Sequence, residues 1–211
     1  MTQRQDMAGL PVLCDGSEEA ERMVILAHGA GAPMDSPFME YFATGLAAAG
    51  NHVLRFEFPY MAERRRTGKK RPPDRQERLL ASWRQIFEAV DFNGKIYIGG
   101  KSMGGRMASL VADELAPAGV ICLGYPFYAP GKVDRPRTAP LENLKTPTLI
   151  VQGERDSMGN RQTVTGYALS PAIRFHWAKD GNHDLVPRKV TGLSAEDNWD
   201  RALQAMTGFL K

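Results

Sequence analysis

Apolar residues along the chain form short continuous runs, separated by longer segments in which apolar positions recur every three or four residues. A short apolar run bounded by Gly or Pro is typical of a buried strand, and the longer period is typical of a helix that buries one face. The runs predict strands at residues 22–27, 52–58, 96–98, 119–123, 146–152 and 173–177, with a shorter edge strand at 11–14.

Helices are predicted in the segments between these runs. Ser36-Pro37 gives a cap followed by proline, which opens a helix to about Ala49 that closes at Gly50. A second helix covers about 74–90, and Ser194-Ala-Glu-Asp resembles a capping box that opens a last helix to about Leu210. The helix that follows Ser102 has one apolar face, made of Met103, Met107, Leu110, Val111 and Leu115.

This alternation of strands and helices predicts an α/β fold with a mostly parallel sheet and helices on both faces, a three-layer sandwich. We expect one domain over residues 1–211, with a poorly defined N-terminal segment at 1–21. In a parallel sheet the loops that follow the strands gather at one edge, where ligands bind. Those loops are 28–33, the connection before residue 74, the turn at Ser102, the loop from Gly124, residues 154–159 and the turn after Trp177.

Composition narrows the class of protein. With 43% hydrophobic and 24% charged residues in a chain of 211, a globular protein is expected. The polar start and the lack of an apolar run near 20 residues predict neither a signal peptide nor a membrane span, and hence a soluble cytoplasmic protein. Cys14 and Cys122, the two cysteines, lie in apolar neighbourhoods and are expected to be reduced thiols of the core.

The net charge of +3 is concentrated in one segment. Between Met61 and Leu80 there are eight basic residues against three acidic ones, so the rest of the chain is slightly acidic. This distribution argues against a protein that binds nucleic acid over its whole surface, and nucleic-acid binding through residues 64–78 is a third, less favoured hypothesis. The basic segment, with Arg64 and Arg65, is on the predicted ligand side and could hold a phosphate or carboxylate of a substrate, or it could be a solvated loop.

The strongest chemical signal is Gly100-Lys-Ser-Met-Gly104, which matches the pattern G-x-S-x-G between a strand and a helix. In that context the serine occupies a sharp turn, and its small neighbours let strand and helix approach closely. The N–H of Met103, at the start of the helix, would then point at an oxyanion forming beside Ser102. The simpler alternative is an ordinary turn in which Ser102 caps the helix.

A nucleophilic serine needs a histidine base and an acid that orients it. Of the four histidines, His183 is on a turn after the last strand, whereas His52 and His176 fall within strands and His28 precedes a glycine turn that it could hold. For the acid we favour Asp156, just past a strand end, with Glu154 as its rival. Asp180 and Asp184 flank His183 and are expected to shape its turn.

Several segments together resemble the α/β-hydrolase superfamily, and the likeness covers residues 23–210. The segments are His28-Gly-Ala-Gly-Ala32, Gly100-Lys-Ser-Met-Gly104, Pro147-Thr-Leu-Ile-Val-Gln-Gly-Glu-Arg-Asp156 and Gly181-Asn-His183, in the order nucleophile, acid, base. Further segments at 55–61, 73–75, 99–106 and 124–127 look like the small dienelactone-hydrolase-like branch, which includes a testis-expressed protein and a subunit of a chromatin acetyltransferase complex.

The resemblance implies that Ser102 is the nucleophile, Asp156 the acid and His183 the base. It also implies an oxyanion hole of the N–H groups of Met103 and Ala30, with Gly31 as an alternative to Ala30. The segment 124–146 is too short for a lid domain, and the reduced N-terminal part implies a sheet of about six or seven strands.

Two interpretations stay open for the residues near the strand-to-helix turn at Ser102, which we call the elbow. Lys101 and Arg106 flank the serine and could favour anionic substrates, or could pair with acids elsewhere. Tyr125, Phe127 and Tyr128 could line an acyl pocket, or could pack over the edge of the sheet.

The leading hypothesis is a serine hydrolase of small esters, thioesters or related acyl compounds, with no metal or organic cofactor. Its partner would be a small-molecule acyl substrate rather than a membrane or nucleic acid. The alternative is an interaction module that keeps the fold without turnover, because related chains include a subunit of a larger complex.

Overall fold

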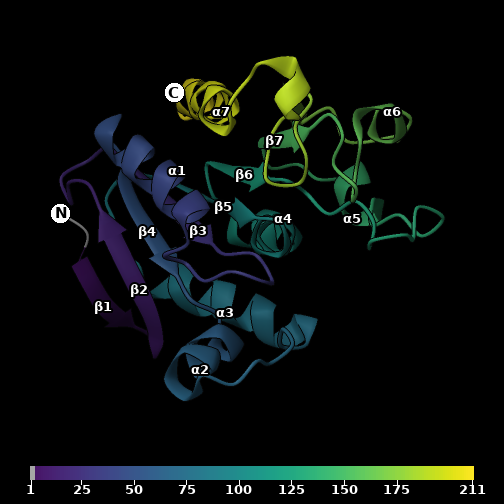
Figure 1. Ribbon diagram of the computed structural model, residues 1–211. Coiled ribbons are helices and arrows are strands. Elements are labelled where there is room, and N and C mark those ends of the chain that lie inside the picture. The colour runs from purple at the N-terminus through teal and green to yellow at the C-terminus, as the bar shows by residue number, and fades with distance from the viewer. Residues whose placement is uncertain (1–2) are drawn as a thin grey trace.

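The apolar runs form the strands of one mixed sheet, which the computed structural model describes over residues 3–211 (Figure 1). Its eight strands are β1 (Gln3–Met7), β2 (Leu10–Asp15), β3 (Arg22–Ala27), β4 (His52–Phe56), β5 (Lys95–Lys101), β6 (Gly119–Leu123), β7 (Thr148–Gly153) and β8 (Ile173–Ala178). They are ordered β1-β2-β4-β3-β5-β6-β7-β8 across the sheet. The pairs β1/β2 and β2/β4 are antiparallel, and all later neighbours are parallel.

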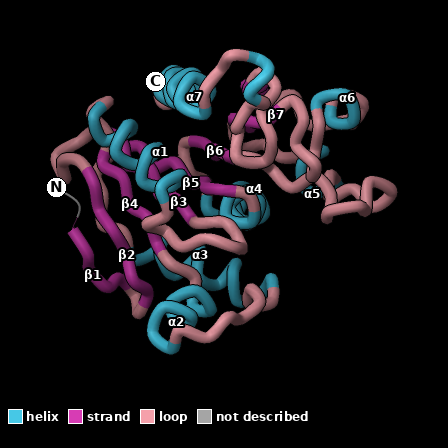
Figure 2. The backbone as a smooth tube through the Cα atoms, viewed as in Figure 1, coloured by secondary structure: helices cyan, strands magenta, loops and turns pink. Residues whose placement is uncertain are grey.

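Helices cover both faces of the sheet, as the cyan tubes around the magenta strands show (Figure 2). They are α1 (Pro37–Ala48), α2 (Pro59–Thr67), α3 (Gln76–Ala89), α4 (Met103–Leu115), α5 (Ala139–Glu142), α6 (Arg161–Val164) and α7 (Ala195–Phe209), with a 3₁₀ turn η1 at Lys189–Thr191. In the described part of the chain, no helix is long and apolar enough to cross a bilayer.

Alternation along the strands creates two hydrophobic cores. Within β3, Val24 and Leu26 pack on the face that α1 and α7 cover, whereas Ile25 and Ala27 pack on the face of α2, α3 and α4. Because side chains alternate with a period of two, one buried strand serves both cores. The result is the three-layer arrangement that the sequence predicts.

The fold confirms an α/β-hydrolase architecture without a lid domain, but the strand count is eight rather than six or seven. The strand that the sequence did not reveal is β1, whose residues Gln-Arg-Gln-Asp-Met carry no apolar run. It lies at the edge of the sheet and pairs with β2 through backbone hydrogen bonds, which need no apolar sequence. Between β6 and β7 the chain forms loops and the four-residue helix α5.

The junction after β4 also differs from the prediction. The strand ends at Phe56 and the helix α2 begins at Pro59, where a basic connection was expected. Only Tyr60 and Met61 of α2 are buried, so the segment has almost no apolar period from which a helix could be predicted. Cys14 is half-buried and Cys122 buried, and both are free thiols, as expected.

Candidate active site

Ser102 lies between the last residue of β5 and the first residue of α4, in a strained backbone conformation with φ 50° and ψ −112°. A positive φ is uncommon for any residue other than glycine and persists only where the surroundings hold it. Here the Ser102 N–H donates to the Leu123 carbonyl, 2.9 Å away, and the Ser102 carbonyl accepts from Arg106 N at the same distance. The Ser102 side chain makes no capping hydrogen bond, so the simple helix-cap interpretation is wrong.

Glycines around Ser102 let the turn approach the end of β3 closely. A Cβ at Gly100 would lie 2.0 Å from the Ala27 carbonyl oxygen, and a Cβ at Gly104 would lie 2.3 Å from the same atom. Both distances are far inside a van der Waals contact with a backbone atom that cannot move freely. The elbow is therefore packed directly against the end of β3.

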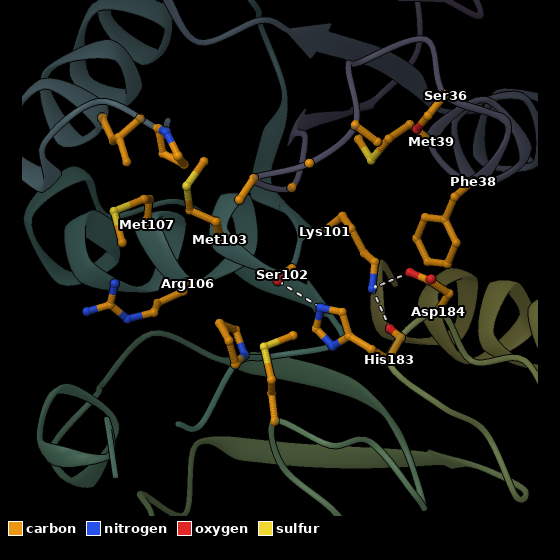
Figure 3. Close-up of a pocket in the computed structure, with 18 of the residues that line it drawn as sticks. Ser36, Phe38, Met39, Lys101, Ser102, Met103, Arg106, Met107, His183 and Asp184 are labelled. Carbon is orange, nitrogen blue, oxygen red and sulfur yellow. Dashed lines mark hydrogen bonds and ion pairs between the residues drawn. The ribbon is translucent and has the colours of Figure 1, made fainter. Parts of the chain in front are cut away.

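A continuous series of hydrogen bonds links three side chains that are far apart in the sequence. Ser102 Oγ is 2.9 Å from His183 Nε2, and His183 Nδ1 is 2.8 Å from Asp156 Oδ2. Because the Asp156 carboxylate can only accept, Nδ1 carries the imidazole proton and Nε2 is left to accept from the Ser102 hydroxyl. Figure 3 shows the Ser102–His183 link at the centre of a pocket.

Asp156 is held in place by further donors. Its side chain is fully buried, Oδ1 accepts from the Met158 N–H at 2.8 Å, and Oδ2 accepts from Gln152 Nε2 at 2.9 Å. Gln152 also exchanges hydrogen bonds with both backbone groups of Tyr125. Sequence reasoning missed Gln152, although a polar residue in an otherwise apolar strand was a visible signal.

The rival acid, Glu154, is bound elsewhere. One carboxylate oxygen accepts from Arg161 Nη1 at 2.8 Å and the other accepts from the Asp180 N–H at 3.0 Å. Asp180 in turn pairs with Arg155 and Arg188. Of the two acids weighed from the sequence, Asp156 is thus the one that contacts His183.

The loop after β3 is fastened by His28. The Phe58 N–H donates to His28 Nε2 at 3.1 Å, so the proton is on Nδ1, which donates to the Gly29 carbonyl at 2.7 Å. Burial lowers the pKa of His28 from 6.5 to about 4, which keeps the imidazole neutral at pH 7. His28 therefore holds the loop, which is the role the sequence suggested.

Tyr60 sets the orientation of two peptide units in the loop after β3, Gly29–Ala30 and Ala30–Gly31. Its hydroxyl donates to the Ala30 carbonyl at 3.0 Å and lies 3.3 Å from the Gly29 carbonyl. In a trans peptide the N–H points opposite to the C=O, so the N–H groups of Ala30 and Gly31 point away from Tyr60. Gly29 lies beside the elbow, since a Cβ there would be 3.7 Å from Ser102 Cβ. Sequence reasoning assigned no role to Tyr60, although the residue lies in the segment 55–61 of the family resemblance.

Lys101 joins the elbow to the turn that carries His183. Its ammonium donates to the His183 carbonyl, pairs with Asp184 at 3.1 Å and lies 5.0 Å from the centre of the Phe38 ring. Burial lowers the pKa of Lys101, and Asp184 acts in the opposite direction. Of its two alternatives, pairing with an acid is the one that the structure shows (Figure 3).

A pocket of about 870 Å³ opens beside Ser102 and His183. Gly29, Ala30 and Gly31 form one wall, and most of the remaining surface is apolar. Its large apolar side chains include Phe38, Met39, Leu79, Met103, Met107 and Trp199. A pocket of this size and character suits a small molecule with an apolar portion.

Four residues weighed for substrate binding are not on this pocket. Tyr125 and Phe127 are fully buried in the core with Tyr128, so the acyl-pocket interpretation is wrong and they pack over the sheet instead. Arg65 pairs with Asp35 and Glu57, and Arg64 lines a separate groove with Lys69 and Lys70. Arg64 and Arg65 are thus placed away from Ser102, whereas residues 73, 74, 76 and 79 of the same basic segment line the pocket.

Comparison with known proteins places the chain in a family. Residues 20–211 match the family model described as "Alpha/beta hydrolase domain", and the chain belongs to that family. Carboxymethylenebutenolidases from Pseudomonas putida and Pseudomonas knackmussii are each 27% identical to it over 107 residues. The aligned segment covers 49% of this chain and 43% of each relative.

Solved structures share the fold at low identity. A dienelactone hydrolase from Anabaena variabilis has a TM-score of 0.73 and 19% identity, with 100% of this chain and 99% of that chain covered. An α/β serine hydrolase without a lid from Xanthomonas campestris has a TM-score of 0.72 and 19% identity, with 97% and 92% covered. These structures show the shared fold, and the narrower likeness to the dienelactone-hydrolase-like branch, with its testis-expressed protein and acetyltransferase subunit, stays a prediction.

Proposed function

We propose that this protein is a serine hydrolase of small esters, thioesters or related acyl compounds, with Ser102 as nucleophile, His183 as base and Asp156 as orienting acid. The observation that carries the proposal is the series of hydrogen bonds Ser102–His183–Asp156 at the wall of an apolar pocket. A strained serine at a strand-to-helix turn adds support, because it presents the hydroxyl without using it as a helix cap.

The first half of the reaction follows from these positions. Ser102 Oγ attacks the substrate carbonyl while its proton passes to His183 Nε2, and Asp156 stabilises the resulting imidazolium through Nδ1–H. The N–H groups of Met103 and of Ala30 or Gly31 would stabilise the oxyanion. The C–O or C–S bond then breaks, and the leaving alcohol or thiol takes the proton from Nε2.

The second half returns the enzyme to its starting state. Water transfers a proton to His183 Nε2 and attacks the acyl group on Ser102. The bond between Oγ and the acyl carbon breaks, Oγ recovers the proton, and the carboxylic acid is released. The protein's share of each step is to hold Nε2 2.9 Å from Oγ and to fix the Asp156 side chain with hydrogen bonds from Gln152 and the Met158 N–H.

The comparisons agree with this class of reaction. Both Pseudomonas relatives are named as carboxymethylenebutenolidases, and the solved neighbours include proteins described as a dienelactone hydrolase and a serine hydrolase. A lactone is a cyclic ester, so an ester or related acyl compound is the substrate class that these names favour for this chain.

A fluorophosphonate probe tests the nucleophile directly. We expect labelling of Ser102 in the wild-type protein and none in Ser102→Ala, together with hydrolysis of short p-nitrophenyl esters that Ser102→Ala lowers at least about 10³-fold. The variant Ser109→Ala is a suitable control, because Ser109 is on the same helix but donates to the Arg106 carbonyl. A folded wild-type protein that resists the probe and hydrolyses no ester would contradict the proposal and favour the interaction module.

A further inference from the structure

Lys101 is a buried cation directly before Ser102. It is the last residue of β5, where its backbone pairs with Leu123 of β6, and its side chain is only 10% exposed. The stem passes Gly29 closely, since a Cβ there would lie 3.4 Å from Lys101 Cγ. Burying a charge is costly unless the charge meets partners, so the contacts of this ammonium indicate what it does beside the nucleophile.

The ammonium of Lys101 holds the backbone of the candidate base. It donates to the His183 carbonyl, which accepts from no backbone N–H within residues 3–211. The imidazole ring is held separately, by Ser102 at Nε2 and by Asp156 at Nδ1. Figure 3 shows the links from Lys101 and from Ser102 to His183. Because Lys101 and Ser102 are neighbours in the chain, the nucleophile and the support of the base are parts of one rigid segment.

The other contacts of the turn that carries His183 do not fix its distance from the elbow. Asn182 Oδ1 accepts from the Asp184 N–H at 2.9 Å, which shapes the turn from within. Trp199 Nε1 donates to the Asp184 carbonyl at 2.9 Å and connects the turn to α7. The contact of Lys101 therefore supplements the Ser102–His183 hydrogen bond with a link that does not use the imidazole ring.

Asp184 balances the charge of Lys101 close to the base. Its carboxylate is 3.1 Å from the ammonium. A Cβ added at Gly124 would lie 3.0 Å from Lys101 Nζ and 3.3 Å from His183 Nδ1, so these nitrogens are separated by at most the sum of the two distances, about 6.3 Å. An unbalanced cation at such a distance would oppose the positive charge that His183 gains when it takes the Ser102 proton.

Three charged residues face His183, namely Lys101 at the end of β5, Asp156 after β7 and Asp184 beside it. Burial lowers the pKa of Lys101, and both carboxylates act in the opposite direction. The remaining charged groups of the pocket come from other elements, Arg106 from α4, Arg137 from the loop before α5 and Asp74 from the segment before α3. Figure 3 shows Arg106 on the other side of Ser102 from Lys101.

We propose that Lys101 is a positioning residue for the base. Its ammonium holds the His183 backbone at a fixed distance from the adjacent nucleophile, and Asp184 neutralises this ammonium so that it does not oppose the imidazolium formed during acyl transfer. The inference rests on the proposed function, since Ser102 and His183 must be the pair that transfers the acyl group.

Steady-state hydrolysis of p-nitrophenyl butyrate tests the anchor. Lys101→Met keeps the length of the side chain but removes the ammonium, so it should lower kcat about tenfold or more and leave KM within about threefold. Lys101→Arg should retain more of kcat than Lys101→Met, because a guanidinium can still donate to the carbonyl and pair with Asp184. Lys95→Met is the matched control, since Lys95 is exposed at the other end of β5 and should change neither constant.

The pH profile of kcat/KM separates this role from a merely structural one. Removing a cation makes protonation of a nearby base easier, so Lys101→Met should raise the midpoint of the acid limb by roughly half a pH unit or more. Removing an anion has the opposite effect, so Asp184→Asn should lower that midpoint. In Lys101→Met/Asp184→Asn the midpoint should return close to the wild-type value, while kcat stays as low as in Lys101→Met because the anchor is missing.

The outcomes distinguish this inference from the proposed function. Ester hydrolysis that requires Ser102, with kcat of a folded Lys101→Met within about threefold of wild type or with both midpoints unmoved, would overturn the positioning role alone. If Lys101→Met does not fold, the exposed-site variant Asp184→Asn decides by the direction of its shift. If no ester is turned over, NMR titration of the His183 ring replaces the profile: midpoints that move in opposite directions in Lys101→Met and Asp184→Asn support the arrangement, and unmoved midpoints overturn it.

Discussion

Two strands of the sheet pass into helices at the same edge, and the two junctions are held by different forces. After β5, the turn at Ser102 packs against the backbone of β3, and α4 buries seven of its residues, including Gly104, under the sheet. After β4, α2 buries only Tyr60 and Met61 and is fastened by the ion pairs of Arg65 with Asp35 and Glu57. The first junction is set by backbone sterics and the second by long side chains.

This difference explains where the chemistry is found. A turn whose backbone packs at contact distance against a strand can hold Ser102 Oγ in place within a fraction of an ångström. Catalysis requires this precision. Long charged side chains are placed by whichever partner they meet, and Arg65 of α2 meets Asp35 and Glu57 rather than the pocket. The junction with the greater local charge is therefore not the candidate active site.

A glycine-to-alanine substitution at each junction gives the largest expected difference in stability and activity. In Gly104→Ala the new Cβ would meet three backbone atoms of Ala27 and His28 within 2.7 Å, so the elbow must separate from β3. We expect a loss of about 3 kcal/mol in the free energy of unfolding and a fall in kcat of about 100-fold, measured by urea denaturation and ester hydrolysis.

The matched change after α2 is Gly68→Ala. Gly68 has φ 68° but open space around its Cβ position, so the cost is about 1 kcal/mol from backbone strain, with activity unchanged. Gly208→Ala, in α7 with open space, should be neutral or slightly stabilising. Equal losses of activity at Gly104 and Gly68 would show that the two junctions do not differ as described.

The same contrast explains how much of the protein could be predicted. The turn at Ser102 and the loop at His28 each carry glycines directly after an apolar run, so the sequence predicted both at the correct edge of the sheet. The structure brings Ser102, His183 and Asp156 together there. Apolar periodicity was sufficient to predict the three-layer arrangement of helices and sheet. It failed at β1 and α2, where polar residues adopt regular structure through pairing or tertiary support.

Partners of long side chains could not be predicted, because they depend on which surfaces the fold brings together. Tyr125 and Phe127 were equally compatible with a pocket and with the core, and the structure buries both. Arg137 had no motif around it, yet it lines the pocket beside Ser102.

A second prediction concerns the pH dependence of the glycine loop. The pKa of His28 is about 4 in the folded protein and 6.5 in an unfolded chain, so between these values the unfolded chain binds a proton that the folded protein does not. The contribution of His28 is complete above pH 6.5 and is lost as the pH falls toward 4, at most about 3 kcal/mol. Urea denaturation at pH 7 and pH 4.5 measures it.

The variant His28→Gln removes this titration while retaining a side-chain oxygen that can accept from the Phe58 N–H. We expect it to be less stable at pH 7 and to lose less stability than the wild-type protein between pH 7 and pH 4.5. His176→Gln is the control. Burial lowers the pKa of His176 as well, but this side chain is only partly buried on β8 and does not hold the loop after β3. An unchanged pH dependence in His28→Gln would mean that His28 does not fasten the loop as a neutral imidazole.

The smallest expected effects are on the basic segment. Arg65→Gln leaves the fully buried carboxylate of Glu57 without its bidentate partner, so we expect a loss of about 1–2 kcal/mol in unfolding free energy with kcat/KM within about twofold. Arg64→Gln should change neither quantity, because its side chain lines a groove away from Ser102. A rise in KM for anionic but not neutral esters in Arg64→Gln would restore the basic segment as a substrate contact and remove the distinction between the two junctions.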